Sequence, residues 1–353
     1  MAKILMKGNE AIGEAAIKAG CRYFFGYPIT PQTELPEYMS RRLPEEGGVF
    51  LQAESEIAAI NMVYGAAGSG ARVMTSSSSP GIALKQEGIS YICGAHLPCV
   101  IINIVRGGPG LGGIQPAQSD YYQVTRGGGN GDYRLIVYAP ANLQETVDIM
   151  QESFDIAEHY RVPVMIVGDG MIGQMMEPIE FKERTAEAAD KPWATTGTKG
   201  ERKPNIINSL YLDPQELEDN NVLLDKKYKE IEKNEVRYEA INIEDADVVV
   251  VAYGTTSRIV KSVLEECDKE GLKVGLIRPI TLWPYPYEAF DKINPDCKGI
   301  LCTEMSLGQM IDDVKIGANG RWQTYFYGRS GGMVPQPEDI KAEIMKIMRG
   351  EAK

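Results

Sequence analysis

The sequence predicts an α/β protein: a parallel sheet with helices on both faces, followed by a second, smaller α/β unit. Apolar strand-like runs alternate with helix-like stretches as far as about residue 180, and the alternation begins again at Asp247. The length of 353 residues corresponds to two domains at about 150 residues each. We therefore expect a large unit at 1–185, a linker or arm at 186–244 and a small unit at 245–353.

Six short apolar runs are the predicted strands of the large unit, and helical stretches separate them. Ser55 precedes apolar residues at helical spacing and is a candidate N-cap, and Asn142 begins a stretch similar to a capping box. Gly20 follows an alanine-rich helical stretch and is a candidate C-cap. The predicted strands are Tyr23–Phe25, Val49–Leu51, Arg72–Thr75, Val100–Val105, Leu135–Tyr138 and Val164–Val167.

The stretch at 186–244 lacks this alternation, and its later part is acidic. From Asp213 to Asp247 there are twelve acidic and five basic residues. Such a composition is typical of a linker with a solvated helix, or of an arm that lies on a partner.

The small unit begins with a strongly apolar strand and ends with an amphipathic helix. The prolines in Trp283–Pro286 are incompatible with regular structure at that point. The predicted elements are strands at 247–254 and 273–277 and helices at 256–271 and 337–349.

Composition and charge exclude several classes of function. The chain has 37 Lys and Arg against 49 Asp and Glu, a formal net charge of −12 and no basic run, so we expect no binding to nucleic acid. The first residues do not form a signal peptide, and no segment approaches the roughly 18 apolar residues of a membrane helix. We expect a soluble, cytoplasmic protein without membrane contact.

Cysteine and histidine offer little for metal chemistry. Six cysteines are scattered without a Cys-x-x-Cys pair, which argues against a zinc site, an iron–sulfur cluster and a disulfide framework. We expect mostly buried, reduced thiols. Only His96 and His159 are available as imidazole bases or metal ligands. No metal site is therefore predicted in this chain.

Three small-residue motifs have the pattern of known sites without meeting their requirements. Gly108–Gly113 fits G-x-G-x-x-G, but Pro116 follows too soon for the helix that a dinucleotide site needs, so we expect a ligand-lining loop or a mobile surface loop. Gly168–Gly170 lacks an asparagine at the spacing of a magnesium site and is interpreted as a strand-end turn. Ser76–Ser79 has no histidine partner for a nucleophilic serine.

Three positions after predicted strands are candidates for chemistry. If Pro31 begins a helix that Thr30 caps, the Thr30 hydroxyl lies where α/β sheets bind ligands, although capping alone explains it equally well. Glu56 follows Glu54 by two positions at a helix start, where stabilisation by the helix dipole is the simpler explanation. Arg106 ends the most apolar run beside the glycine loop and suits a carboxylate or phosphate ligand.

Taken together, these segments resemble the alpha subunit of 2-oxoacid:ferredoxin oxidoreductases. The resemblance covers nearly the whole chain except the acidic linker, and Tyr-Pro-Ile-Thr-Pro is its most specific part. It rests on Lys7–Ala11, Phe25–Pro31, Gln52–Glu56, Gly65–Ala67, Arg106–Gly110 and Glu304–Gln309. Three more segments are most similar to the branched-chain (2-oxoisovalerate) type, with the 2-oxoglutarate type as the nearest rival: Pro31–Glu34, Ser76–Gly81 and Gly127–Arg134.

The resemblance implies coenzyme A-dependent oxidative decarboxylation of a branched-chain 2-oxoacid, with thiamine diphosphate as cofactor and ferredoxin as electron acceptor. It makes 1–185 the pyrimidine-type domain of a thiamine-diphosphate-binding fold and 245–353 a transketolase-C-terminal-like domain. A beta subunit with the diphosphate-binding domain, a gamma subunit and a ferredoxin-like subunit would carry Mg²⁺ and the iron–sulfur clusters, so the chain alone should be inactive. The alternatives are the same chemistry on 2-oxoglutarate or pyruvate, or a non-catalytic scaffold subunit.

The resemblance also implies roles for residues around the cofactor. Glu56 matches the glutamate that promotes the imino tautomer of the aminopyrimidine ring, and Glu54 is its neighbouring competitor. Tyr27 and Pro28 belong to the cofactor-binding segment. Because the cofactor supplies its own base, the shortage of histidine does not count against an enzyme.

For the substrate, the resemblance implies two contacts and a loop. Thr30 would hydrogen-bond the substrate carboxylate or the adjacent oxygen, and Arg106 would pair with the carboxylate before it leaves as carbon dioxide. The loop 107–113 would close over the substrate.

Overall fold

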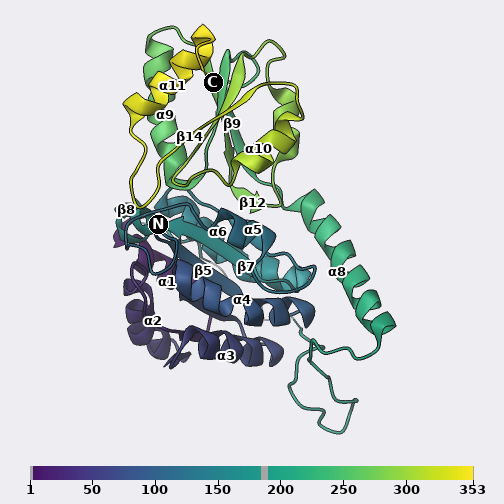
Figure 1. The fold of residues 1–353 in the computed structure, drawn as a ribbon. Helices are drawn as coiled ribbons and strands as arrows, with labels where there is room; N and C mark the ends of the chain where they lie inside the picture. The colour runs from purple at the N-terminus through teal and green to yellow at the C-terminus, as the bar shows by residue number, and fades with distance from the viewer. Residues whose placement is uncertain (1–2, 184–189, 353) are drawn as a thin grey trace.

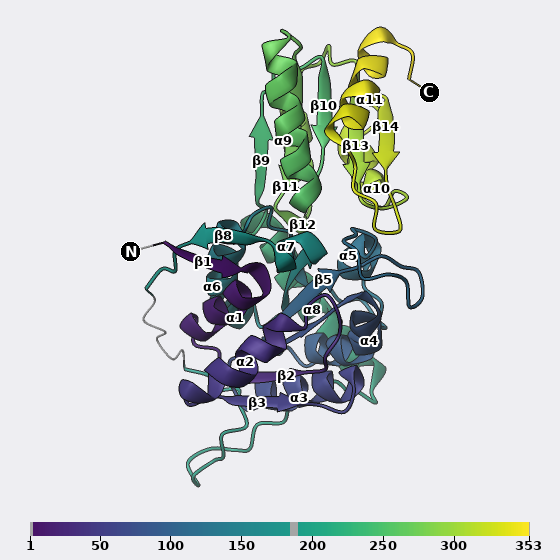
Figure 2. The same cartoon turned by 90° about the vertical axis from the view of Figure 1, so that its left-hand side faces the viewer.

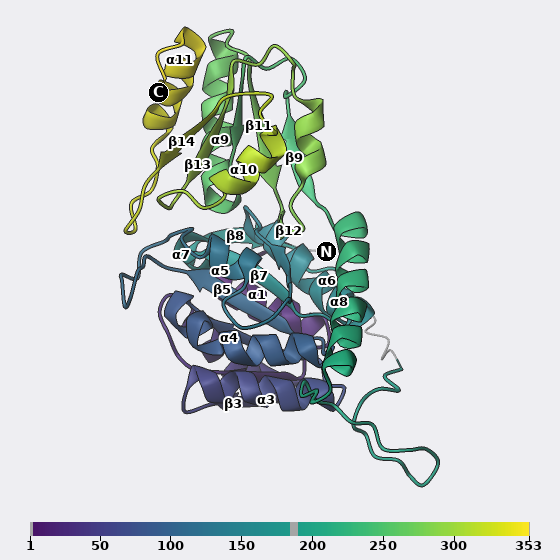
Figure 3. The ribbon, with the colours of Figure 1, turned by 45° about the vertical axis from the view of Figure 1, so that its right-hand side comes forward.

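The computed structural model describes residues 3–183 and 190–352, which form two α/β units stacked end to end (Figure 1). The N-terminal unit contains a seven-stranded sheet and the C-terminal unit a five-stranded sheet. Helix α8 (Pro214–Asn234) runs along one side of the N-terminal unit, and only part of the irregular segment before it projects away from the body (Figure 3), because Trp193 and Ile207 pack against the core. The predicted α/β fold class is confirmed.

All six strands predicted for the large unit are present and parallel to one another. The strands β4, β5, β6 and β7 are buried along their whole length, as expected for a parallel sheet covered on both faces. A seventh strand, β12, pairs antiparallel to β6 at the edge. In order across the sheet, the strands are β12 (Thr281–Trp283), β6 (Ile136–Tyr138), β7 (Val164–Asp169), β5 (Val100–Val105), β4 (Val73–Ser77), β2 (Tyr23–Gly26) and β3 (Val49–Gln52).

Helices cover both faces of this sheet. Helices α1, α2 and α6 pack together on one face (Figure 2), and α3 and α4 pack together on the other. The predicted N-caps are confirmed: Ser55 accepts a hydrogen bond from Ala58 N at 3.1 Å, and Asn142 accepts one from Glu145 N at 2.9 Å. The C-cap of α1 is Ala19, and the predicted Gly20 lies one residue beyond it with φ +84°. The helices are α1 (Gly8–Lys18), α2 (Glu34–Glu45), α3 (Glu56–Gly68), α4 (Ser79–Gly94), α5 (Tyr121–Arg126), α6 (Leu143–Tyr160) and α7 (Gly170–Gln174).

The C-terminal unit places α9 and α11 against one another on one face of its sheet and α10 with a short 3-10 helix, η1, on the other (Figure 1). The strands and helices predicted for this unit are confirmed. Across the sheet the strands are β14 (Thr324–Gly328), β13 (Gly299–Glu304), β10 (Val248–Val251), β11 (Val274–Pro279) and the antiparallel β9 (Tyr238–Ile241). The helices are α9 (Gly254–Lys269), η1 (Tyr287–Lys292), α10 (Ile311–Ala318) and α11 (Pro337–Arg349).

The structure differs from the sequence-based predictions between the two units. The predicted linker 186–244 contains β9, which pairs with β11 in the C-terminal sheet. Trp283, predicted to lie outside regular structure, is the last residue of β12 in the N-terminal sheet. Pro284 can follow it because β12 is an edge strand that ends there. One strand therefore crosses the predicted boundary in each direction.

A third, two-stranded sheet near the N-terminus has no counterpart in the predictions. It consists of β1 (Ile4–Lys7) and β8 (Met176–Ile179), which pair antiparallel. Pro178 lies within β8, and a proline within a short run weakens the strand signal in a sequence.

The six cysteines are buried free thiols, as predicted. Burial raises the pKa of each of them, for example that of Cys21 to about 12, so they are protonated and inert. Within residues 3–183 and 190–352, no helix is both long and apolar enough to cross a bilayer.

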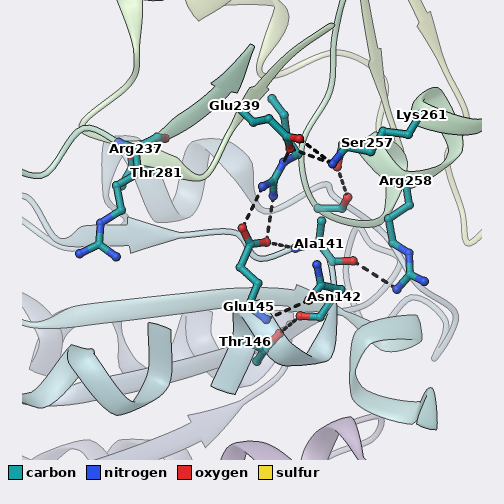
Figure 4. A network of polar contacts seen from close by, with 12 residues as sticks. Ala141, Asn142, Glu145, Thr146, Arg237, Glu239, Ser257, Arg258, Lys261 and Thr281 are labelled. Carbon is teal, nitrogen blue, oxygen red and sulfur yellow. Dashed lines mark hydrogen bonds and ion pairs between the residues drawn. The ribbon is translucent and has the colours of Figure 1, made fainter. Parts of the chain in front are cut away.

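A buried arginine joins the two units. Glu145 of α6 and Glu239 of β9 face one another across the interface (Figure 4). Arg278 of β11 donates from both Nη atoms to the Glu145 carboxylate, at 2.8 and 2.9 Å, and from Nε to Glu239 at 2.8 Å. Lys261 of α9 also donates to Glu239, at 2.8 Å. Because Arg278 is buried, these bonds replace hydration that the guanidinium has lost.

Substitution of Arg278 by methionine is expected to destabilise the chain by about 2–3 kcal/mol, since Glu145 is left desolvated without its cation. Urea unfolding of the parent and the variant measures the difference. The double variant Arg278→Met, Glu145→Gln removes both charges and is expected to recover at least part of the loss. If the parent and Arg278→Met have the same free energy of unfolding, this network does not stabilise the contact between the two units.

Candidate active site

The predicted site residues lie at one edge of the seven-stranded sheet. Strands β2, β3, β4 and β5 are parallel, so their carboxyl ends meet at the same edge. Tyr27 and Thr30 follow β2, Glu56 begins the helix after β3, and Arg106 directly follows β5. The structure therefore gathers at one edge the residues that the sequence singles out.

The segment from Tyr27 to Pro31 is held by buried side-chain amides. Asn9 of α1 donates to the Pro31 carbonyl at 2.9 Å, and Gln32 donates to the Tyr27 carbonyl at 3.3 Å. The hydroxyl of Ser76, on β4, donates to Gln32 Oε1. Asn9, Gln32 and Ser76 are completely buried, so the segment is anchored from below while Tyr27, Pro28 and Thr30 remain exposed.

The prediction that Thr30 caps a helix beginning at Pro31 is wrong. The chain first makes a turn in which Gln32 N donates to the Ile29 carbonyl at 3.1 Å, and α2 begins only at Glu34. Thr30 therefore does not cap α2. Its carbonyl instead accepts a hydrogen bond from Arg106, which links two of the predicted site residues directly.

Burial distinguishes Glu56 from its competitor Glu54. Glu56 is the first residue of α3 and only 7% exposed, whereas Glu54 is exposed to solvent. Ser55, and not Glu56, caps the helix. Among the described residues, no group donates a hydrogen bond to the Glu56 carboxylate. The side chain is therefore largely buried while its carboxylate oxygens still reach solvent, which leaves them accessible to a ligand.

Glu56 lies against α4 at a position where only glycine fits. A Cβ on Gly81 would come within 2.8 Å of Glu56 Oε1 and 2.0 Å of Ser77 Oγ. Glu56 Oε1 and Ser77 Oγ therefore both lie close to Gly81 at the N-terminal end of α4. The side-chain hydroxyls of Ser77 and Ser78 are buried, and no described residue is their hydrogen-bond partner.

Substitution of Gly81 by alanine is expected to displace Glu56 and Ser77 and to reduce enzymatic turnover at least tenfold, because a shift of about 1 Å at a reacting group has large kinetic effects. Gly65→Ala is the matched control: it lies on the exposed face of α3, where a Cβ would meet no atom within 4 Å. Steady-state kinetics and thermal unfolding of both variants test the prediction. Equal turnover in the two variants would contradict it.

Arg106 is buried and organises the site. Its Nη1 donates to the Thr30 carbonyl at 2.9 Å and its Nη2 to the Leu111 carbonyl at 3.0 Å, while its main-chain N–H donates to the Ser79 hydroxyl at 3.1 Å. Nε is buried, and the described residues offer it no acceptor. Arg106 therefore links Thr30, α4 and the glycine loop, and its Nε–H has no described acceptor.

Main-chain hydrogen bonds close the glycine loop at 107–113, which was predicted to be a ligand-lining or a mobile surface loop. Gly113 N donates to the Gly107 carbonyl at 2.9 Å, and Gly107 N donates to Gln115 O at 3.0 Å. A Cβ on Gly112, at φ +58°, would lie 1.8 Å from the Gly107 oxygen. No helix follows the motif before α5, so it is not a dinucleotide-binding turn, as predicted. Leu111 at the tip is 82% exposed.

Asp169 is a strand-end residue, as predicted for the Gly168–Gly170 motif. Its carboxylate accepts hydrogen bonds from Met171 N at 2.8 Å and Ile172 N at 3.3 Å and so caps α7. Burial raises the pKa of Asp169. No group of three or more His, Cys, Asp or Glu side chains in the described part of the chain is arranged to hold a metal.

Sequence reasoning missed the buried polar residues beneath the site: Asn9, Gln32 and Lys85. Lys85 is completely buried on α4. It lies on the same face of α4 as Ile82, Ile89 and Ile92, which are also buried. A lysine at this position among apolar residues was the sequence signal that could have identified it. For Asn9 and Gln32 no comparable signal exists, since amides also occur on solvated faces.

Two protein-family models match the chain. Residues 14–245 match the thiamine diphosphate-binding domain of pyruvate flavodoxin/ferredoxin oxidoreductase, and residues 246–340 match core domain II of pyruvate:ferredoxin oxidoreductase. This chain belongs to the 2-oxoacid:ferredoxin oxidoreductase family. The resemblance seen in the sequence is thus confirmed, and with it membership of a family of oxidoreductases that act on 2-oxoacids.

Relatives within the 2-oxoacid:ferredoxin oxidoreductase family match over nearly their full length. The ketoisovalerate oxidoreductase subunit VorB of Methanothermobacter marburgensis is 48% identical over 98% of each chain. The 2-oxoglutarate synthase subunit KorA of Methanothermobacter thermautotrophicus is 36% identical over 98% of each chain. The pyruvate synthase subunit PorA of Thermotoga maritima is 28% identical over 99% of this chain and 95% of its own.

Solved structures support the same family and fold. The 2-oxoglutarate:ferredoxin oxidoreductase from Magnetococcus marinus matches 98% of this chain with a TM-score of 0.86 and 26% identity, and this chain spans 65% of that chain's length. A split-gene transketolase, 14% identical, matches 98% of each chain with a TM-score of 0.61 and is similar in fold alone. The predicted thiamine-diphosphate-binding fold is confirmed.

Proposed function

We propose that this chain is the alpha subunit of an enzyme that oxidises branched-chain 2-oxoacids, principally 2-oxoisovalerate, to acyl-CoA and carbon dioxide. The observation that carries the proposal is the order of identities: 48% to a ketoisovalerate oxidoreductase subunit, 36% to a 2-oxoglutarate synthase subunit and 28% to a pyruvate synthase subunit. The second candidate substrate is 2-oxoglutarate, because the solved structure with a TM-score of 0.86 is a 2-oxoglutarate enzyme.

Tyr27, Pro28 and Glu56 are the residues that we propose to bind thiamine diphosphate. The site fits such a group because the Glu56 carboxylate has no described donor and the buried hydroxyls of Ser77 and Ser78 beside it lack described partners. When bound, the cofactor supplies a carbon nucleophile and accepts the electron pair left by decarboxylation. Glu56 would hold the aminopyrimidine ring of the cofactor and would share a proton with its N1′ atom.

Thr30 and Arg106 are the residues that we propose to bind the substrate carboxylate. Thr30 is exposed at the edge of the sheet, where its hydroxyl can donate to a ligand. Arg106 holds the Thr30 carbonyl and retains an Nε–H without a described acceptor. The loop 107–113, tied to the same guanidinium through Leu111, is proposed to cover the substrate and exclude water.

The remaining parts of the reaction are proposed to lie on other chains. The six cysteines here are buried and unpaired, which supports placing the iron–sulfur clusters on partner subunits. The partners are a beta subunit with the diphosphate-binding domain and Mg²⁺, a gamma subunit and a ferredoxin-like subunit, with ferredoxin and coenzyme A as reactants. We propose a cytoplasmic complex in which 1–185 is the pyrimidine-type domain, 186–244 the linker and 245–353 the transketolase-C-terminal-like domain.

The experiment that tests this function is a comparison of three substrates with the purified complex. Anaerobic, coenzyme A-dependent reduction of methyl viologen is measured with 2-oxoisovalerate, 2-oxoglutarate and pyruvate. The highest kcat/KM is expected with 2-oxoisovalerate. A clear preference for 2-oxoglutarate would overturn the branched-chain assignment while leaving the reaction class intact, and the isolated chain is expected to be inactive with all three.

A further inference from the structure

The glycine loop 107–113 is contacted by the C-terminal unit where its two ends meet. Gly107 N donates to the Gln115 carbonyl at 3.0 Å, and this bond closes the neck of the loop. Figure 3 shows the loop between β14 and α11 of the C-terminal unit reaching toward the loop that follows β5. The residues that come close are Gly331 and Gly332. A Cβ built on Gly107 would lie 3.4 Å from the main chain of both.

Gly332 packs so closely against the neck of the glycine loop that no side chain fits there. A Cβ built on Gly332, at φ +93°, would overlap Gln115 Cβ and lie 3.1 Å from Gln115 Cγ. Only glycine combines this backbone angle with such a close approach. The C-terminal unit therefore brings its main chain into direct contact with Gln115, one of the two residues that close the loop.

The chain that leaves the glycine loop is also bound to the C-terminal unit. Gln118 is buried, and its main-chain N–H donates to the Met305 carbonyl at 2.9 Å. Its side-chain oxygen accepts hydrogen bonds from Met305 N at 3.0 Å and from Thr256 Oγ1 at 2.8 Å, and Nε2 donates to the Tyr253 carbonyl at 2.9 Å. All three partners belong to the C-terminal unit, so both ends of the Gln118 amide are engaged across the interface.

A buried carboxylate fixes the segment 304–309, which supports the chain after the loop. Glu304 ends β13 and is completely buried, and its carboxylate accepts hydrogen bonds from Gln309 N at 3.2 Å and Met310 N at 3.1 Å. The Gln309 side chain in turn donates to the Ser119 carbonyl at 2.7 Å. The sequence resemblance singles out this segment, and the proposed function leaves it without a role. The structure shows it as a support for the residues that follow the glycine loop.

We propose that the C-terminal unit positions the glycine loop over the substrate, with Gly332 and Gln118 as its positioning residues. The inference rests on the proposed function of the loop 107–113 as a cover of the substrate. Arg106 fixes the start of the loop from within the N-terminal unit, and the C-terminal unit fixes the chain at its end. These contacts are made on folding, so the loop loses little further conformational freedom when the substrate binds.

The substitution Gly332→Ala in the reconstituted complex is expected to displace Gln115 and to loosen the neck of the loop. Amide hydrogen exchange at 107–113 is expected to become about tenfold faster, because the loop opens more readily. The KM for 2-oxoisovalerate is expected to rise about tenfold with a smaller change in kcat, because ordering of the loop then opposes substrate binding. A purely structural defect would lower the amount of assembled enzyme, and so the apparent kcat, at unchanged KM.

Gly271→Ala is the matched control. Gly271 has φ +75° on the surface of the C-terminal unit, and a Cβ there would meet no atom within 4 Å. The variant therefore introduces similar backbone strain without the collision and is expected to change neither exchange at 107–113 nor KM.

A rescue variant tests whether the collision with Gln115 causes the effect. Gln115→Gly removes the Cβ and Cγ that the new methyl group would strike and leaves Gln115 Cα at 3.6 Å. Addition of Gly332→Ala to Gln115→Gly is therefore expected to change exchange and KM by less than about twofold, in contrast to its effect on the parent. If Gly332→Ala does not assemble, Gln309→Met removes the bond to Ser119 at a half-buried position and is expected to accelerate exchange in the loop.

Separate outcomes overturn the two proposals. Unchanged exchange at 107–113 in an assembled Gly332→Ala complex would overturn the positioning role, and so would an equal effect in Gly271→Ala. Unchanged exchange in Gln309→Met would do the same if only that variant assembles. Faster exchange in Gly332→Ala with an unchanged KM would refute the proposed function of the loop as a cover of the substrate, while the hold of the C-terminal unit on the loop would stand.

Discussion

Replacement of Glu56 by glutamine in the reconstituted complex is expected to lower turnover of 2-oxoisovalerate by about 10²–10⁴-fold, the range for loss of a positioned acid–base group. Glutamine has nearly the same volume and fits beside Gly81, so the complex is expected to assemble. It cannot share a proton with N1′ as a carboxylate does. Initial rates of methyl viologen reduction, at saturating thiamine diphosphate, measure the loss.

The matched control for this prediction is Glu54→Gln. It makes the same chemical change two residues earlier, at a side chain that is exposed. Surface substitutions change free energies by about 0.5 kcal/mol or less, so its turnover is expected to stay within about twofold of the parent. Near-normal turnover in Glu56→Gln would remove the activating role and favour a scaffold subunit, whereas equal losses in both variants would point to a general effect of charge.

The fold was predictable because its signals are local. A run such as Val100–Val105 is apolar throughout, and a parallel strand covered on both faces requires that pattern. Ser55 and Asn142 cap their helices through hydrogen bonds three residues away, which a sequence displays directly. The edge of the sheet where ligands bind follows from strand direction alone, so Glu56 and Arg106 could be placed there without coordinates.

The contacts that define the site were not predictable, because their partners are distant in the chain. Asn9 reaches Pro31, and Arg106 reaches Thr30 across 76 positions. Strand β12 supplies an edge of the N-terminal sheet from beyond residue 280, where prolines suggested irregular structure. Sequence patterns assign each residue to a helix, a strand or a loop. They do not show which residues form hydrogen bonds across the fold, because the order of the elements in space differs from their order in the chain.

Replacement of Arg106 by lysine is expected to lower kcat/KM for 2-oxoacids by about 100-fold. Lysine keeps the charge, but one ammonium cannot reproduce the fork that serves both the Thr30 and the Leu111 carbonyl. The residue is only 6% exposed, so water does not readily replace the lost donors. Steady-state kinetics with 2-oxoisovalerate measure the effect, and Arg106→Ala is expected to be worse because it also removes the cation.

The expected loss of kcat/KM has two possible origins, binding of the substrate carboxylate and anchoring of the loop 107–113, and separate measurements distinguish them. If the guanidinium binds the substrate carboxylate, the Kd of an unreactive carboxylate analogue rises in both variants. If it also holds the loop 107–113, amide hydrogen exchange and proteolysis at the loop accelerate, because Leu111 loses its anchor. We expect both changes, with thiamine diphosphate affinity little affected since Arg106 makes no hydrogen bond or ion pair with Glu56 in the described structure. Unchanged kinetics with a faster-exchanging loop would leave Arg106 a structural residue and remove it from the substrate site.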